Sequence, residues 1–278
     1  MTGFGHAPPH VARLADGVSR VLAPNPSMMT GPGTNTYLFG RHAVAVVDPG
    51  PAIPEHLDAV EQAAAGPIRF ILVTHTHPDH SPAAALLAER TGAQLLGRPA
   101  PDGPHQDATF VPARILADGE VLQTDEFQLE AIHTPGHASN HLCYRHVETN
   151  WLVTGDHVIE GSTVVIDPPD GNMADYIASL EKLKRLNCAA LLPGHGERID
   201  DPRRVIDWIV EHRLAREATV LAALTANPDS TGRELVAKVY TDVPAELHPL
   251  AERSLLAHLE KLGEEARASC AAGRWSAL

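Results

Sequence analysis

The feature that most constrains this chain is an apolar run that ends abruptly in a cluster of histidines and an aspartate. Residues 70–73, Phe-Ile-Leu-Val, form the kind of β-rich run that predicts a buried strand. Ser81 and Pro82 predict an N-cap and a first helical residue, so we expect a helix over residues 83–90. Between strand and helix lie four side chains of metal-binding type, His75, His77, Asp79 and His80.

These four side chains predict a metal site. Imidazole nitrogen and carboxylate oxygen together favour zinc, with iron or manganese as alternatives. In an extended backbone, alternation sends His75, His77 and Asp79 to one side and His80 elsewhere, which suits two metals better than one. A solvated strand-to-helix turn is the plain alternative, but it predicts no similar endings elsewhere in the chain.

Four other apolar segments end in the same way. Residues 43–47 precede Asp48, and residues 127–132 precede the turn that contains His137. Residues 151–155, which form an expected strand pair with residues 142–144, precede Asp156, and residues 189–192 precede the turn that contains His195. Two three-ligand sites with open positions need six terminal ligands and one bridging ligand. Besides Asp48 the sequence supplies seven: His75, His77, Asp79, His80, His137, Asp156 and His195.

From about residue 201 the character of the chain changes to helical. Helices are expected over residues 203–225 and 249–266, and Thr231 with Glu234 forms a capping box that opens another. Earlier in the chain, Asn172 is expected to cap a helix over residues 173–186. The sequence therefore predicts an α+β fold with a small helical or winged-helix C-terminal part.

Charge separates the two expected domains, residues 1–202 and 203–278. The second has ten Lys and Arg against eleven Asp and Glu, a net charge of −1, and the first has twelve against twenty-four, a net charge of −12. Nucleic-acid binding needs clustered Lys and Arg, and the helix after Thr231 offers only Arg233 and Lys238. Packing, or a homodimer formed through the C-terminal domain, is therefore favoured over nucleic-acid contact there.

Cysteine usage and hydropathy bear on the compartment. Cys143, Cys188 and Cys270 are widely separated and form no C-x-x-C pair, which predicts free thiols in a reducing compartment. Residues 1–21 contain no apolar run long enough for a signal peptide, and no stretch reaches the length of a membrane span. We expect a cytoplasmic protein without a membrane partner.

The ordered series of ligand-type residues resembles the metallo-β-lactamase superfamily, whose members are metallohydrolases with a four-layer αββα sandwich. The matching motifs, spread over about residues 15–200, are Asp48, His75-x-His77-x-Asp79-His80, His137, Asp156 and His195. Residues 33–38, 134–137 and 193–196, with the helical tail, are similar to the β-lactamase-like-protein-2 group. Animal members of that group are single-strand-directed endoribonucleases, and related fungal members are acyl-carrier thioesterases.

The resemblance implies two Zn2+ ions, with iron or manganese as alternatives. One metal would bind His75, His77 and His137, the second would bind Asp79, His80 and His195, and Asp156 would bridge them. A metal-bridging hydroxide would be the nucleophile, and Asp48 would hold the metal loop, residues 75–80.

The same resemblance suggests roles for three further side chains. Asp79 would steer the hydroxide as well as bind metal, so it is a candidate catalytic residue. His141 is a candidate donor to the substrate or leaving group, with a supporting or solvated role as the alternative. Asn35 lies in a loop that the family fold places near the site and is a candidate substrate contact.

Three functions are compatible with these motifs. The first is a binuclear zinc hydrolase of a small ester, thioester or amide, which the acidic first domain favours. The second is a single-strand endoribonuclease, which the group resemblance favours and the charge of −12 opposes. The third is a non-catalytic protein that binds metal or nucleic acid, against which the full ligand set argues. Secreted β-lactamases often carry Cys where Asp156 stands, so antibiotic hydrolysis is disfavoured.

Overall fold

The computed structural model describes residues 10–278, and these form two compact units. Unit 1 contains residues 10–134, 140–162 and 187–202, and unit 2 contains Pro135–Ser139, Thr163–Leu186 and Arg203–Leu278. Unit 2 thus takes in two segments that precede residue 203, and the domain boundary expected from the sequence stays a prediction. Residues 1–9, on which part of the signal-peptide prediction rests, lie outside the described residues.

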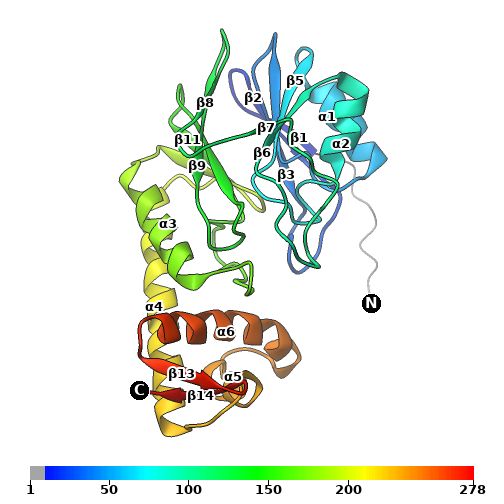
Figure 1. Ribbon diagram of the computed structural model, residues 1–278. Helices are drawn as coiled ribbons and strands as arrows, with labels where there is room; N and C mark the ends of the chain where they lie inside the picture. The colour runs from blue at the N-terminus through cyan, green and yellow to red at the C-terminus, as the bar shows by residue number, and fades with distance from the viewer. Residues whose placement is uncertain (1–9) are drawn as a thin grey trace. The chain divides into compact units, whose positions relative to one another are not determined.

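Unit 1 is built on two β-sheets (Figure 1). The first has seven strands in the order of the chain: β1 (His10–Ala15), β2 (Val18–Leu22), β3 (Asn35–Phe39), β4 (Val44–Val47), β5 (Ile68–Leu72), β6 (Gln94–Gly97) and β7 (Arg114–Ile115). The second has five strands in the order β12 (Ala190–Pro193), β11 (Trp151–Gly155), β10 (Leu142–His146), β9 (Gln128–His133) and β8 (Val121–Gln123). Strands β4 to β7 run parallel, as do β11 and β12, and the other neighbours are antiparallel.

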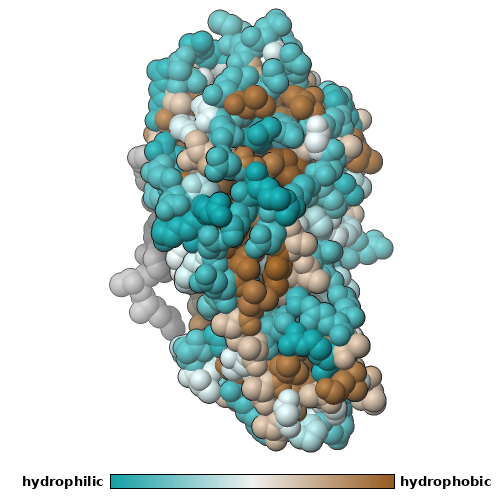
Figure 2. All heavy atoms as spheres, turned by 90° about the vertical axis from the view of Figure 1, so that its left-hand side faces the viewer, coloured by the Kyte–Doolittle hydropathy of each residue, from teal (hydrophilic) through white to brown (hydrophobic). Residues whose placement is uncertain are grey.

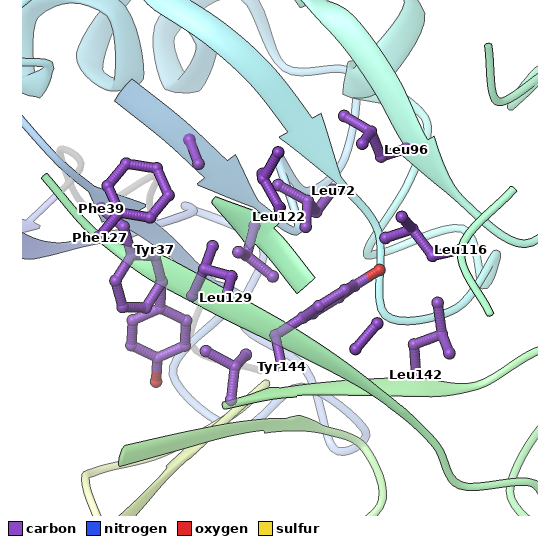
Figure 3. Close-up of a cluster of buried hydrophobic side chains, with 14 of the residues drawn as sticks. Tyr37, Phe39, Leu72, Leu96, Leu116, Leu122, Phe127, Leu129, Leu142 and Tyr144 are labelled. Carbon is purple, nitrogen blue, oxygen red and sulfur yellow. The ribbon is translucent and has the colours of Figure 1, made fainter. Parts of the chain in front are cut away.

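The main core of unit 1 lies between the two sheets. Successive residues of a strand point to opposite faces of the sheet, so alternate residues enter this core. In β3, Tyr37 and Phe39 join side chains of the second sheet such as Leu129 and Tyr144, as Figure 3 shows. Leu38, between them, belongs instead to the core on the other face of the sheet. Strands buried on both faces explain the nearly continuous apolar runs in the sequence.

Helices α1 (Pro54–Ala63) and α2 (Ala83–Thr91) supply apolar side chains to that second core. The expected N-cap at Ser81 is wrong: α2 begins after Pro82 without a side-chain cap, because Ser81 Oγ donates instead to Asp107 Oδ2 at 2.6 Å. The sequence over residues 18–22 and 94–97 predicts strands, and these form as β2 and β6, whereas β1, β7 and β8 have no counterpart in the sequence-based expectations.

Unit 2 is mainly helical. It contains α3 (Met173–Arg185), most of α4 (Pro202–Ala226), α5 (Gly232–Val239), the short 3-10 helix η1 (Ala245–Leu247), α6 (His248–Glu264) and the hairpin of β13 (Ala268–Ala271) and β14 (Arg274–Ala277). Apolar side chains of α4, α5 and α6 form its core, together with Ala268 at the start of the hairpin. The α+β class expected from the sequence is therefore confirmed.

Local capping signals in unit 2 are confirmed by hydrogen bonds. Asn172 Oδ1 accepts from the backbone N–H of Asp175 at 2.9 Å, and Thr231 forms the expected capping box with Glu234. Both motifs satisfy backbone donors that the first turn of a helix leaves without an intrahelical partner.

The surface mixes polar and apolar side chains on the face drawn in Figure 2. Among the large apolar residues of α4, Trp208 and Leu214 are exposed. Within residues 10–278, the helices are either too short or too polar to cross a membrane.

Candidate metal centre

Ligand-type residues of unit 1 follow the ends of strands. Asp48 follows β4, the loop with His75 to His80 follows β5, Asp156 follows β11, and His195 follows β12 by one residue. Strands β4 and β5 are parallel, as are β11 and β12. Parallel neighbours end at the same edge of a sheet, so each pair delivers its polar residues together.

Four of these side chains converge on one place: Asp79, His80, Asp156 and His195. One ligand atom from each lies within 4.8 Å of the others. His195 Nε2 is 3.1 Å from Asp79 Oδ2 and 3.3 Å from Asp156 Oδ1. His80 Nε2 lies 3.3 Å from the same Asp156 oxygen. Two imidazoles and two carboxylates in this arrangement match the donor set of a zinc, iron or manganese ion.

The two imidazoles are held so that Nε2 faces the cluster. His80 Nδ1 is 2.9 Å from Asp48 Oδ2, and His195 Nδ1 is 3.1 Å from the backbone oxygen of Gly33. Both oxygens are acceptors, so each Nδ1 donates its proton to them and each Nε2 is the nitrogen that faces the cluster. This is how outer partners prepare a histidine for metal binding.

Asp48 ties the loop together, as the family resemblance implies. Its Oδ1 accepts from Thr74 N at 2.6 Å, and its Oδ2 accepts from Thr74 Oγ1 at 2.7 Å as well as from His80. The residue is 1% exposed and has a φ of 51°, which is unusual for a non-glycine residue. Aspartate tolerates this left-handed conformation better than most residues, so the position combines a tight turn with an anchor.

The buried charges of the cluster depend on one another. Burial opposes ionisation of His80, but the carboxylates of Asp79 and Asp156 outweigh it and raise its pKa well above the usual value. Burial likewise opposes ionisation of His195, and Asp156 foremost raises its pKa to about 10. Burial would raise the pKa of Asp156, but His195 and His80 hold it well below the usual value. A divalent cation would take the place of the protons on the imidazoles, so metal binding should release protons.

Close approach of the backbone leaves no room for a side chain at residue 194. A Cβ on Gly194 would lie 2.7 Å from His80 Cε1 and 2.8 Å from Asp156 Oδ1. The Pro193-Gly194-His195 sequence therefore lets the end of β12 pass directly beside the cluster.

His75 and His77 lie together in the same loop. His75 Nδ1 is 3.0 Å from Thr74 Oγ1, and His75 Nε2 is 2.9 Å from His77 Nδ1. The expectation that Asp79 shares one side with this pair while His80 points elsewhere is wrong, because Asp79 and His80 share the cluster. Strand β5 ends at Leu72, and a turn closed by His80 N donating to His77 O replaces the extended backbone that alternation requires.

His137 belongs to the segment Pro135–Ser139 of unit 2. Its Nδ1 donates to the backbone oxygen of Val165 at 2.8 Å, so the proton is on Nδ1. A Cβ on Gly136, whose φ is 139°, would lie 2.3 Å from Tyr176 Cα, which explains the glycine before this histidine. The membership of His137 in a metal site stays a prediction.

His141 and Asn35 are both fully buried. His141 is 2.9 Å from Thr134 Oγ1 through Nδ1, and its ring stacks on that of His75 with centroids 5.1 Å apart. Its catalytic role stays a prediction. Asn35 donates to the backbone oxygens of Pro193 and Gly196 at 3.0 and 2.8 Å. These two hydrogen bonds hold the turn that carries His195, and the expected contact of Asn35 with substrate stays a prediction.

Sequence reasoning missed two groups that shape the site. Thr74 binds Asp48 through both its N–H and its hydroxyl, and its place directly before His75 is the only local signal. Gly33 contributes a backbone oxygen, which no side-chain pattern could reveal.

Comparison with family models gives two matches. Residues 29–195 match the model of the metallo-beta-lactamase superfamily, and residues 231–275 match that of the beta-lactamase associated winged helix domain. The first match includes all seven expected metal ligands, and the second covers α5, α6 and the start of the terminal hairpin.

Relatives match over nearly the whole chain. The Beta-lactamase-like protein 2 homolog of Drosophila melanogaster is 33% identical over 273 residues, covering 93% of this chain and 92% of that protein. The Atrochrysone carboxyl ACP thioesterase of Aspergillus fumigatus is 30% identical, covering 86% of this chain and 78% of that protein. The crystal structure of a metallo-beta-lactamase family protein from Thermus thermophilus matches in fold with a TM-score of 0.80 at 23% identity, covering 96% of this chain and 100% of that chain.

Proposed function

The chain belongs to the metallo-β-lactamase superfamily, and on that premise we propose that it is a binuclear zinc hydrolase of a small ester, thioester or amide. The observation that carries this proposal is the convergence of Asp79, His80, Asp156 and His195, with both imidazoles turned to present Nε2. His75, His77 and His137 complete the proposed ligand set through the family motif.

These residues fit divalent cations because their imidazole nitrogens and carboxylate oxygens are already held in place for metal binding. Asp48 and the oxygen of Gly33 fix the two imidazoles, so little ordering is needed when a metal binds. When bound, the cations supply Lewis acidity that acidifies water and polarises a substrate carbonyl. We propose zinc from the mixed histidine and aspartate donors, and metal analysis will separate zinc from iron and manganese.

Asp79 is the member of the cluster best placed to meet substrate. Its side chain is 25% exposed, compared with 14% for Asp156 and 0% for His80. We propose that Asp79 orients the attacking water by accepting a hydrogen bond from it, in addition to binding metal.

The proposed catalytic role of His141 requires its ring to reach the substrate or leaving group. In the structure the ring is fully buried behind His75 and is held at Nδ1 by Thr134. This placement also supports a simpler role, in which His141 steadies His75. Replacement by glutamine, followed by separate measurement of kcat and metal content, distinguishes the two roles.

Two observations favour a small acyl substrate. Residues 1–202 have a net charge of −12, which opposes binding of a polyanion near the site. The relative from Aspergillus fumigatus is named a thioesterase, and it is 30% identical over 258 residues. A thioester is therefore the first substrate class to test.

The test compares zinc-loaded wild-type protein with Asp79→Asn and with Asp58→Asn, a control at an exposed carboxylate on α1. Parallel wells contain an acyl thioester, a chromogenic ester, a chromogenic β-lactam and a labelled single-stranded RNA. Elemental analysis of the same samples gives the metal bound per chain. We expect thioester or ester turnover that Asp79→Asn removes and Asp58→Asn keeps.

Other outcomes lead to different functions. RNA cleavage that depends on Asp79 and weakens steeply with salt would establish the endoribonuclease function in spite of the charge. Bound metal without turnover in any well would favour a non-catalytic binding protein.

A further inference from the structure

The loop over residues 98–110 is fastened to the metal loop at several points. It begins after Gly97 at the end of β6 and ends at Phe110, whose side chain is buried in the core under the first sheet. Residues 102–105 at its tip are exposed, and the loop has no helix or strand of its own. The proline and glycine residues over residues 98–113 predict a surface loop.

The first attachment is at Thr76, which lies between His75 and His77. Thr76 is fully buried, and its Oγ1 donates to Gln106 Oε1 at 2.5 Å. The same Oγ1 accepts from Asn140 Nδ2 at 2.9 Å. A single hydroxyl thus joins the metal loop to the loop over residues 98–110 and to the segment before β10.

The second attachment is Asp107, which holds the metal loop at two places. Its backbone N–H donates to the oxygen of Thr76 at 2.7 Å, and its Oδ2 accepts from Ser81 Oγ at 2.6 Å. Ser81 directly follows His80, so Asp107 spans the stretch that contains the proposed ligands. Asn140 completes the network by donating to the backbone oxygen of Pro99 at 3.1 Å.

We propose that Thr76, Asp107 and Asn140 are positioning residues that set the metal affinity of the loop over residues 75–80. This stretch contains neither helix nor strand, so hydrogen bonds from outside must hold its backbone. Orienting partners of metal ligands usually act on the ligand side chain, whereas this network holds the backbone between ligands. The inference rests on the proposed function only in taking His75, His77, Asp79 and His80 as metal ligands.

The experiment measures zinc affinity by competition with a chromophoric chelator, with no substrate present. Thr76→Val keeps the shape of the side chain and removes both hydrogen bonds, so zinc affinity should fall about 10- to 100-fold, as for other outer partners of metal sites. Thr76→Ser keeps the hydroxyl and should stay within about threefold of wild type. Thr91→Val is the matched control, because Thr91 Oγ1 donates to the Leu87 oxygen at 2.7 Å and accepts from Ala93 N, so its hydrogen bonds stay at the end of α2.

Thermal unfolding separates positioning from general stability. Zinc binding raises the unfolding temperature by an amount that grows with the logarithm of the zinc affinity, so Thr76→Val should show a smaller zinc-dependent increase than wild type. Ser81→Ala, which breaks only the contact with Asp107, should show a smaller loss in the same direction.

Equal losses of unfolding temperature with and without zinc, at unchanged zinc affinity, would overturn the inference and leave the network a structural role. A wild-type protein that binds no zinc, iron or manganese would instead overturn the proposed function itself. The two failures therefore give different results in the same measurement.

Discussion

Each unit of this protein buries a cluster of charged side chains, and the two clusters differ in what balances their charge. In unit 1, Asp79 and Asp156 face His80 and His195. In unit 2, Glu217 faces Lys261 Nζ at 2.7 Å and Arg267 Nη1 at 2.9 Å. Both glutamate and lysine there have side chains no more than 10% exposed.

The difference shows which buried cluster can take a ligand. Lysine and arginine are cations whose charge is not readily exchanged, so the cluster around Glu217 is complete. Histidine carries a proton that a metal ion can replace, so the cluster in unit 1 can be completed by a divalent cation. Burial and charge alone would not distinguish the two clusters, whereas the identity of the cationic partners does.

Removing a carboxylate from the unit 1 cluster should give the largest change. Asp156→Asn takes away the proposed bridging ligand, and we expect hydrolysis to fall on the order of a thousandfold, about 4 kcal/mol in activation free energy. Unfolding of unit 2 should be unchanged. Activity assays and elemental analysis of the same samples test this prediction. Full activity in the variant would show that Asp156 is not an essential metal ligand.

Removing the carboxylate of the unit 2 cluster should change stability and leave chemistry intact. Glu217→Gln removes the buried carboxylate from Lys261, which keeps only the more exposed Glu265 as a charged partner, and this should lower the free energy of unfolding by about 2 kcal/mol. Asp229→Asn breaks a pair with Arg274 in which both side chains are exposed, and should cost less than about 1 kcal/mol. Denaturant titration measures both, and equal effects would contradict the importance of burial.

Two glycine replacements compare the space that each unit leaves for an added methyl group. Gly194→Ala would push a methyl group against His80 and Asp156, and we expect zinc affinity to fall about 10- to 100-fold. Gly232→Ala in α5 would meet the ends of the flexible Leu256 and Glu252 side chains, and should be neutral or stabilise by up to about 1 kcal/mol. Chelator competition for the first and denaturant titration for the second give the two values.

Acid should weaken unit 2 through His258. Burial, with the nearby charges of Arg213 and Lys261, lowers the pKa of His258 to about 3. The unfolded chain, with a pKa near 6.5, binds the proton first, so stability is full above pH 6.5 and falls as pH drops toward 3. The slope is at most about 1.4 kcal/mol per pH unit.

His258→Leu should flatten the slope between about pH 6.5 and 5, because no proton is then taken up at this position on unfolding. Denaturant titrations of both proteins at several pH values provide the comparison. Parallel pH dependence in the two proteins would place the acid sensitivity elsewhere.

The sequence predicted features that depend on neighbouring residues. The capping box of Thr231 and Glu234 and the cap at Asn172 are confirmed because a cap needs only three or four residues. The apolar runs before Asp48 and Asp156 are confirmed as strands β4 and β11. Nearly all of their residues are buried, so the sequence shows each strand as a continuous apolar run. The family motif then predicted the fold, which the Thermus thermophilus structure matches.

Features that depend on distant contacts could not be predicted in the same way. Strand β7 has two exposed residues, too few for a pattern. Thr76 meets Gln106 and Asn140, which lie 30 and 64 residues away in sequence. Where the terminal hairpin β13–β14 forms, the sequence predicts only a turn at Gly273, because the four-residue strands are short and partly exposed.

The left-handed backbone of Asp48 has a consequence for anyone who would transplant this site into another scaffold. Glycine at this position would keep the turn and lose the anchor, and glutamate would keep a carboxylate and strain the turn. Asparagine tolerates the turn, but its amide cannot accept from Thr74 and His80 with both of its terminal atoms. A designer who copies only the ligands would therefore leave behind the residue that aims one of them.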